Sequence, residues 1–170
     1  MKIAVYGGSF NPPHNGHVNA AGIASADLKP DLFLIIPDNI PPHKLLAEGS
    51  PSPDQRLEMC RLAFSGIDNA VISTIELNRG GKSYTVDTLR QLHELYSGAD
   101  IHLIIGQDMA DSFDTWYHPD EILEMCTLYV LPRTPESSTL AREDLKSGGG
   151  SEYLPPAVYE YIIRNHLYGT

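Results

Sequence analysis

Five short apolar segments recur along the chain, separated by longer stretches in which apolar residues return every three or four positions. The short segments are rich in Ile, Val and Leu, which is typical of strands buried on both faces of a parallel sheet. We therefore expect β-strands at residues 2–6, 32–36, 70–75, 101–105 and 127–131.

The stretches between these segments have the spacing of helices. One predicted helix carries Leu57, Cys60, Ala63 and Phe64 on one face, and a second carries Val86, Leu89, Leu92, His93 and Tyr96. A last helix is expected over residues 155–166, where an initial proline suits a helix start. Because strands and helices alternate, the pattern predicts a doubly wound α/β fold with a parallel sheet between two helical layers, α/β/α.

Composition narrows the class of protein. The 170 residues are 42% hydrophobic and 20% charged, which predicts one globular domain over residues 1–170. Apolar runs are too short for a membrane span or a signal peptide. Cys60 and Cys126 lie in apolar helical patterns without metal-ligand spacing, so we interpret both as core thiols of a protein in the reducing cytoplasm.

The charge balance limits the partners. With 12 Lys and Arg against 22 Asp and Glu, the formal net charge is -10, which disfavours a general nucleic-acid binder. Small anionic substrates stay possible if a few cations and backbone amides gather in one cleft. Glycine and proline concentrate in residues 7–16, 37–53 and 148–156, and the first two clusters follow the first two predicted strands. Open α/β sheets bind ligands at that edge.

The strongest local signal is GGSFNPPHNGH, residues 7–17. Gly7 and Gly8 permit a close approach of the backbone to a ligand, and the two prolines that follow stiffen the loop. The helix expected to begin near Gly16 or His17 points free amides at that ligand, which favours phosphate. His14 and His17 add donors at the same place.

The two histidines have other possible interpretations. They could be surface residues, or a metal pair, although a zinc site needs further ligands that the sequence does not offer at suitable spacing. The segment also lacks GxGxxG, so it is not a dinucleotide fingerprint.

Taken together, these motifs resemble the HxGH nucleotidyltransferases, in the form typical of bacterial nicotinate-nucleotide adenylyltransferases. The resemblance extends in order over PPHK (41–44), Arg56 and its helix, ELNRGGKSYTVDTL (76–89), GQDMADSFDTWY (106–117) and SSTLAR (137–142). It implies a Rossmann-like domain that transfers the adenylyl group of ATP to nicotinate mononucleotide in NAD synthesis, releasing pyrophosphate. Nicotinamide mononucleotide or phosphopantetheine as acceptor, and a non-catalytic nucleotide-binding module, are the alternatives.

The same resemblance assigns roles to residues. His14, His17, Lys44 and Arg142 are expected to be catalytic. ATP is expected to contact Gly7, Gly8, Ser9, Phe10, His17, Ser137, Ser138, Thr139 and Arg142. Magnesium is expected to arrive on ATP and keep most of its water, which requires no carboxylate cage on the protein.

The pyridine nucleotide is expected to contact Ser83, Tyr84, Thr85, Asp108, Trp116 and Arg133. Trp116 stacks on the pyridine in this interpretation; its alternative is a hydrophobic cover on the sheet. Asp108 is a ribose or metal-water acceptor or else a helix cap, and Ser83 or Thr85 can cap the helix that follows them.

One departure from the family pattern lies between Arg133 and Ser137. Only three residues stand there, whereas family members usually insert a further helix and strand before SSTxxR. Either the sheet edge is shortened or a segment is missing from the sequence. Glu136 also stands where an apolar residue is usual. Both features weaken the assignment of roles to residues 137–142, and Arg133 is a candidate cation to compensate for Arg142.

Overall fold

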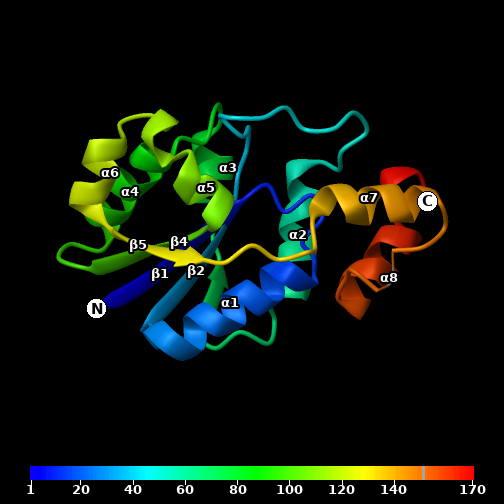
Figure 1. Cartoon of the computed structure of the whole chain (residues 1–170), viewed down its shortest axis with the longest axis horizontal. Coiled ribbons are helices and arrows are strands. Elements are labelled where there is room, and N and C mark those ends of the chain that lie inside the picture. Colours follow the sequence, from blue (N-terminus) through cyan, green and yellow to red (C-terminus); the bar gives the residue numbers. More distant parts are fainter. Residues whose placement is uncertain (151) are drawn as a thin grey trace.

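A computed structural model of the chain describes residues 1–150 and 152–170 and contains a five-stranded parallel sheet (Figure 1). Its order is β3-β2-β1-β4-β5, and every neighbouring pair is parallel. The strands are β1 (Lys2–Gly8), β2 (Leu32–Pro37), β3 (Ala70–Ile72), β4 (Asp100–Gly106) and β5 (Thr127–Leu131). All five predicted strands are therefore present.

The prediction for the third strand was wrong at its end. Instead of continuing to residue 75, β3 stops at Ile72, and Ile75 already begins a helix. The amide of Ser73 still donates to the carbonyl of Ile35 at 2.8 Å, but the Ser73 hydroxyl then accepts from the amide of Ile75 at 3.3 Å. This side-chain bond turns the backbone away from the sheet.

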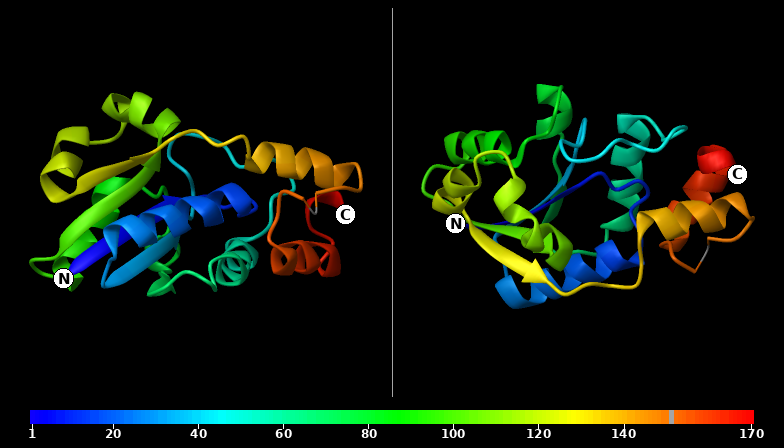
Figure 2. Two further views of the ribbon diagram at one scale, coloured as in Figure 1. Left: turned by 60° about the horizontal axis from the view of Figure 1, so that its bottom comes forward. Right: turned by 45° about the horizontal axis from the view of Figure 1, so that its top comes forward.

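Helices cover both faces of the sheet. They are α1 (Asn15–Leu28), α2 (Pro53–Ala63), α3 (Ile75–Arg79), α4 (Thr85–Leu95), α5 (Gln107–Asp111), α6 (Pro119–Met125), α7 (Ser138–Lys146) and α8 (Pro156–Arg164). Alternate residues of β1 enter different cores: Ala4 packs with α1, α2 and α8, whereas Ile3 and Val5 pack with α4 and α6. The three-layer α/β/α fold is confirmed (Figures 1 and 2).

The strand order places a ligand crevice between β1 and β4. The chain runs outward from β1 to β3 and then returns to β4 on the other side of β1. Loops that follow β1 and β4 therefore leave in opposite directions, and open α/β sheets bind ligands at this point. Figure 2 shows α7 and α8 beyond the end of β5, where the C-terminal part of the chain extends past the sheet.

The sheet ends at β5 in the described part of the chain. Residues 132–137 connect β5 directly to α7, so the described part of the chain has no strand beyond β5 at this edge. This connection lies against the start of α1: a Cβ added to Gly16 would meet Oγ1 of Thr134 at 3.0 Å. The short connection therefore reaches the segment that carries the two histidines.

Two smaller predictions concern cysteines and membrane spans. Neither cysteine is disulfide-bonded. Cys60 is fully buried in the core, while Cys126 is half-buried and its thiol donates to the carbonyl of Ile122 at 3.3 Å. No helix among residues 1–150 and 152–170 has the length and apolar character that crossing a bilayer requires.

Candidate functional site

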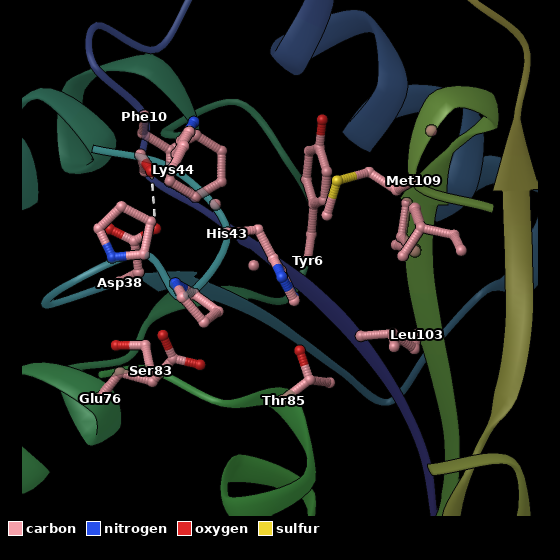
Figure 3. A pocket seen from close by; sticks show the side chains of 18 of the residues that line it. Tyr6, Phe10, Asp38, His43, Lys44, Glu76, Ser83, Thr85, Leu103 and Met109 are labelled. Atoms are coloured by element: carbon pink, nitrogen blue, oxygen red, sulfur yellow. Dashed lines mark hydrogen bonds between the residues drawn. The ribbon is translucent and has the colours of Figure 1, made fainter. Parts of the chain in front are cut away.

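A pocket of about 400 Å³ opens at the carboxyl ends of β1 and β4 (Figure 3). Gly7 and Gly8 contribute from β1, and Gly106 contributes from β4. Of the predicted site residues, those that line it are Gly7, Gly8, Ser9, Phe10, His17, Lys44, Ser83, Thr85, Trp116 and Ser138. Three residues not predicted to bind a ligand, Asp38, His43 and Glu76, also line it.

The turn after β1 is held by the ring of Phe10. Its backbone has the left-handed φ of 45°, and its side chain is 2% exposed. The ring packs against His17, with centroids 5.0 Å apart, and against Phe64 at 5.4 Å. A Cβ on Gly8 would approach the Phe10 ring to 3.3 Å, so a glycine at this position allows the turn to fold back on the core. We infer that Phe10 shapes the loop.

His14 and His17 cap the first helix reciprocally. The amide of His17 donates to Nδ1 of His14 at 3.4 Å, and the amide of His14 donates to Nδ1 of His17 at 3.1 Å. The rings stack with centroids 3.7 Å apart. Because each Nδ1 accepts a hydrogen bond, each neutral imidazole carries its hydrogen on Nε2. Helix capping thus fixes both tautomers and makes the two Nε2–H groups available as donors.

The surroundings keep both imidazoles neutral at pH 7. Burial lowers the pKa of His14 to about 4, although the charge of Glu136 opposes this shift. Burial, with smaller contributions from His14 and Lys44, lowers the pKa of His17 well below its ordinary value. An anion bound at this helix start reverses the balance, because its charge favours the protonated rings.

Lys44 enters the pocket from the loop after β2. Burial lowers the pKa of its amine, and the positive charges of Arg142 and Arg56 lower it further, while Asp38 raises it. This cation is therefore held among other cations without an anion sufficient to compensate them. A bound polyphosphate supplies that charge.

Arg56 joins the two loops that form one side of the pocket. Its side chain is fully buried, with one nitrogen 2.7 Å from the carbonyl oxygen of Ser9 and 3.2 Å from Oδ1 of Asp38. The other donates to the carbonyls of Asp38 at 2.7 Å and Asn39 at 3.3 Å. Ser9 in turn donates its hydroxyl to Oδ2 of Asp38 at 2.7 Å. Arg56 was expected only as part of the family helix, and its role as a structural clamp was missed.

Arg142 and its neighbours attach α7 to the first loop. Arg142 donates to the carbonyl of Asn11 at 2.6 Å, and Ser138 donates to the carbonyl of Pro12 at 2.9 Å. Ser137 caps α7 by accepting from the amide of Leu140 at 3.1 Å. Thr139 accepts from Arg142 at 3.3 Å. The structure thus brings this motif next to the histidine loop, but of its four predicted residues only Ser138 lines the pocket.

The expected helix cap after Gly81 was wrong. Tyr84 occupies the N-cap position of α4 and neither it nor its neighbours provides a side-chain cap bond. The Ser83 hydroxyl instead accepts from the amide of Asn39 at 2.8 Å, which ties this segment to the loop after β2. Thr85 is the first residue of α4 and lines the pocket.

The position of Trp116 agrees with either of its two alternative roles. It is 8% exposed and packs on Phe113 with ring centroids 5.1 Å apart, as a hydrophobic cover does. It also lines the pocket, where the ring of His43 faces it at 5.9 Å with a tilt of 32°. The PPHK string contained His43, but its role as an aromatic neighbour of Trp116 required the folded loop.

Asp108 and Arg133 are paired with each other. Arg133 lies 2.5 Å from Oδ1 of Asp108 and 3.5 Å from Asp111, and all three side chains are largely exposed. Asp108 lies inside α5, whose N-cap is Gly106 without a side-chain bond, so the helix-cap alternative was wrong. Neither Asp108 nor Arg133 lines the pocket.

Comparison with known proteins agrees with this arrangement. The family model described as cytidylyltransferase-like matches residues 5–164. A protein from Listeria monocytogenes named as a nicotinate-nucleotide adenylyltransferase is 37% identical, over 99% of this chain and 97% of its own. One from Geobacillus thermodenitrificans with the same name is 37% identical, over 99% of this chain and 87% of its own.

Solved structures show the same fold. A nicotinate-nucleotide adenylyltransferase structure from Vibrio parahaemolyticus has a TM-score of 0.80 at 28% identity, covering 99% of this chain and 96% of that one. A Plasmodium falciparum nicotinic acid mononucleotide adenylyltransferase complexed with NaAD has a TM-score of 0.78 at 18% identity. The match covers 99% of this chain and 97% of that one. Both agree with the α/β/α architecture described above.

The length of the alignments bears on the short connection before α7. The alignment with the Listeria protein extends over 186 positions, more than the 170 residues of this chain, so that relative contains residues that this chain lacks. Coverage is nevertheless almost complete at both ends. The chain belongs to the cytidylyltransferase-like family and, within it, to the nicotinate-nucleotide adenylyltransferases.

Proposed function

We propose that the chain transfers the adenylyl group of ATP to nicotinate mononucleotide, giving nicotinate adenine dinucleotide and pyrophosphate in NAD synthesis. The observation that carries this proposal is the pair of reciprocally capped imidazoles at a helix start, beside a pocket at the β1–β4 switch point. Relatives of this name cover nearly the whole chain and support the same reaction.

The reaction places few demands on proton transfer. The second pKa of a phosphate monoester is about 6, so the attacking phosphate is mostly ionised at pH 7 without a base. Alignment of the two bound anions contributes on the order of 7 to 11 kcal/mol to lowering the barrier, and fixed donors to the developing charge contribute further. His14 and His17 provide such donors through Nε2–H, and Lys44 provides positive charge.

In this proposal magnesium arrives with ATP. Among residues 1–150 and 152–170, no three His, Cys, Asp or Glu side chains are grouped so as to hold a metal ion. Bound with ATP near Lys44 and Arg142, magnesium would offset part of the triphosphate charge and keep several of its waters. Arg142 follows the family pattern as a ligand of the β and γ phosphates, with Ser137, Ser138 and Thr139 beside it.

The pyridine end of the acceptor is assigned to the other side of the pocket. In this assignment the backbone at residues 83–85 receives the nicotinate carboxylate through the amide of Thr85, because the amides of Ser83 and Tyr84 already donate to the carbonyls of Ile40 and Lys82. Trp116 stacks on the ring. His43 lies beside Trp116, with ring centroids 5.9 Å apart, so it is an aromatic neighbour of this stacking surface. Asp108 is assigned to the ribose, which requires its ion pair with Arg133 to open. Two free thiols support the assignment to a reducing cytoplasm.

The deciding experiment supplies ATP and magnesium with either nicotinate or nicotinamide mononucleotide and follows pyrophosphate release. We expect turnover with preference for nicotinate mononucleotide. Release from neither acceptor refutes the proposal, and ATP binding without turnover supports the alternative of a binding module.

Substitution of one imidazole tests the mechanism. His17→Ala removes a fixed donor and is expected to lower kcat by about 10² to 10³ while the protein remains folded. His166→Asn is a matched control: this histidine is exposed in the C-terminal segment at a left-handed φ of 52°, which asparagine also tolerates. An unchanged rate in His17→Ala removes this residue from the mechanism.

A further inference from the structure

Glu76 is a buried carboxyl group in the wall of the pocket, and no role was predicted for it. It is the second residue of α3, and only 7% of its surface is exposed. Its Oε1 accepts a hydrogen bond from the Thr88 hydroxyl of α4 at 2.7 Å. Figure 3 shows its carboxyl beside Ser83, with Thr85 nearby on the same side of the pocket. Glu76 therefore borders the segment assigned to the nicotinate carboxylate.

The groups that face Glu76 leave its charge poorly compensated. From its own helix, Arg79 donates to Thr88 at 3.0 Å and to Gln91 at 2.6 Å, so it reaches Glu76 through the Thr88 hydroxyl. From the end of β2 comes the carboxylate of Asp38, whose oxygens are already bonded to Ser9 and Arg56. The negative charge of Asp38 opposes ionisation of Glu76, and Arg79 acts on it only through the Thr88 hydroxyl. The ionised form of this buried carboxyl is therefore poorly stabilised.

Protonation of Glu76 near neutral pH agrees with this environment. Burial, with a smaller contribution from Asp38, raises the pKa of Glu76 to about 7, against the opposing effects of Thr88, Ser83 and Arg79. The side chain thus changes charge within the range in which a cytoplasmic enzyme works.

We propose that Glu76 is a specificity-determining residue that tolerates an anionic pyridine substituent when it is protonated and repels one when it is ionised. The inference rests on the proposed function, which places that substituent at residues 83–85. Nicotinate presents a carboxylate there, whereas nicotinamide presents a neutral amide. Raising the pH therefore weakens the binding of nicotinate mononucleotide relative to that of nicotinamide mononucleotide.

The size of the effect follows from linkage. If the nicotinate carboxylate raises the pKa of Glu76 by about one unit, ionised Glu76 weakens nicotinate binding about tenfold, because the coupling between two bound species is reciprocal. The neutral amide has no such coupling. Both acceptors carry the same 5'-phosphate, so the titration of that phosphate and of the groups that bind it cancels in their ratio.

The test is the ratio of kcat/KM for the two mononucleotides between pH 6 and 8.5. We expect the preference for nicotinate to fall about tenfold over this range in the native protein and to be independent of pH in Glu76→Gln, which keeps the shape of the side chain without its charge. Glu94→Gln is the matched control, because Glu94 is an exposed glutamate of α4, and it should retain the native profile.

Two outcomes overturn the inference: a ratio that does not change with pH in the native protein, or one that falls equally in Glu76→Gln. The first of these outcomes is measured on the native protein, so it remains decisive even if Glu76→Gln does not fold. Dissociation constants of the two mononucleotides, measured by calorimetry over the same pH range, give the same ratio without turnover. Absence of turnover with intact binding therefore refutes the proposed function alone, while a flat binding ratio refutes the role of Glu76.

Discussion

Replacing Arg56 with methionine tests the clamp beneath the pocket. Methionine has a similar length and is apolar, so it can occupy a fully buried position without the charge. The change removes four hydrogen bonds, one to Ser9, two to Asp38 and one to Asn39. Asp38, whose side chain is 10% exposed, then keeps only the Ser9 hydroxyl as a partner.

The expected cost is about 4 kcal/mol of unfolding free energy. Removing one partner of a buried ion pair costs about 3 to 5 kcal/mol, because the remaining charge is buried without compensation. The clamp is not ideal, since Nε of Arg56 has no partner in the described residues, and this argues against a larger figure. Typical domains are stable by about 5 to 15 kcal/mol, so Arg56→Met should fold but with a much reduced margin.

Urea unfolding at pH 7 measures this cost, together with Asp38→Asn and the double variant. Asparagine keeps an oxygen for Arg56 but leaves its buried charge uncompensated, so we expect Asp38→Asn to cost about 3 kcal/mol. The double variant should cost clearly less than the two single changes added together. Because Ser9 and Asp38 line the pocket, Arg56→Met should also raise the KM for ATP. A loss below about 1 kcal/mol for Arg56→Met, or strict additivity, refutes the assignment of Arg56 as a clamp.

Three further changes have defined outcomes. The pKa of Glu76 is raised from 4.5 to about 7, so the folded state binds this proton more tightly; stability should fall by about 3 kcal/mol from pH 4.5 to above 7 relative to Glu76→Gln, measured by urea unfolding. Gly16→Ala places a Cβ 2.9 Å from the His14 ring, and should lower kcat about tenfold with little loss of thermal stability. Tyr168→Phe removes the buried hydroxyl that donates to Oδ1 of Asn11 at 2.7 Å, and should cost about 1 to 2 kcal/mol in urea unfolding.

Periodicity predicted the sheet because buried parallel strands leave a strong local pattern. The strand that was predicted too long shows the limit. Thr74 and Ile75 are β-branched like the strand before them, but the Ser73 hydroxyl accepts from the amide of Ile75 and turns the chain. Which of two competing local hydrogen bonds forms depends on the neighbouring strand and helix. Apolar patterning does not encode that choice.

A charged residue on a core face was visible in the pattern but was not interpreted. Arg56 stands four and seven residues before Cys60 and Ala63, which places it on their side of α2. Such a position predicts burial and hence partners, since an arginine is rarely buried without them. Its partners come from two loops 47 and 18 residues away in the chain, and no local pattern identifies them.

The walls of the pocket were less accessible to sequence reasoning than its floor. Gly7, Gly8 and His17 form one continuous motif, so their juxtaposition is local. His43 meets Trp116 only because the loop after β2 and the turn after α5 converge over the sheet. Contacts of this kind depend on tertiary packing between segments far apart in the chain.

The distribution of charge links the acidic chain to its anionic substrates. A net charge of -10 repels polyanions at a distance. Nevertheless, Arg56 and Arg142 lie close enough to Lys44 to lower the pKa of its amine. Arg56 is neutralised by Asp38, and Arg142 donates to a neutral carbonyl, so Lys44 and Arg142 hold the positive charge that a triphosphate can offset. Binding of a triphosphate should therefore raise the pKa of Lys44, because its negative charge favours the protonated amine. A small phosphate ester can thus be bound locally by a chain whose net charge is negative.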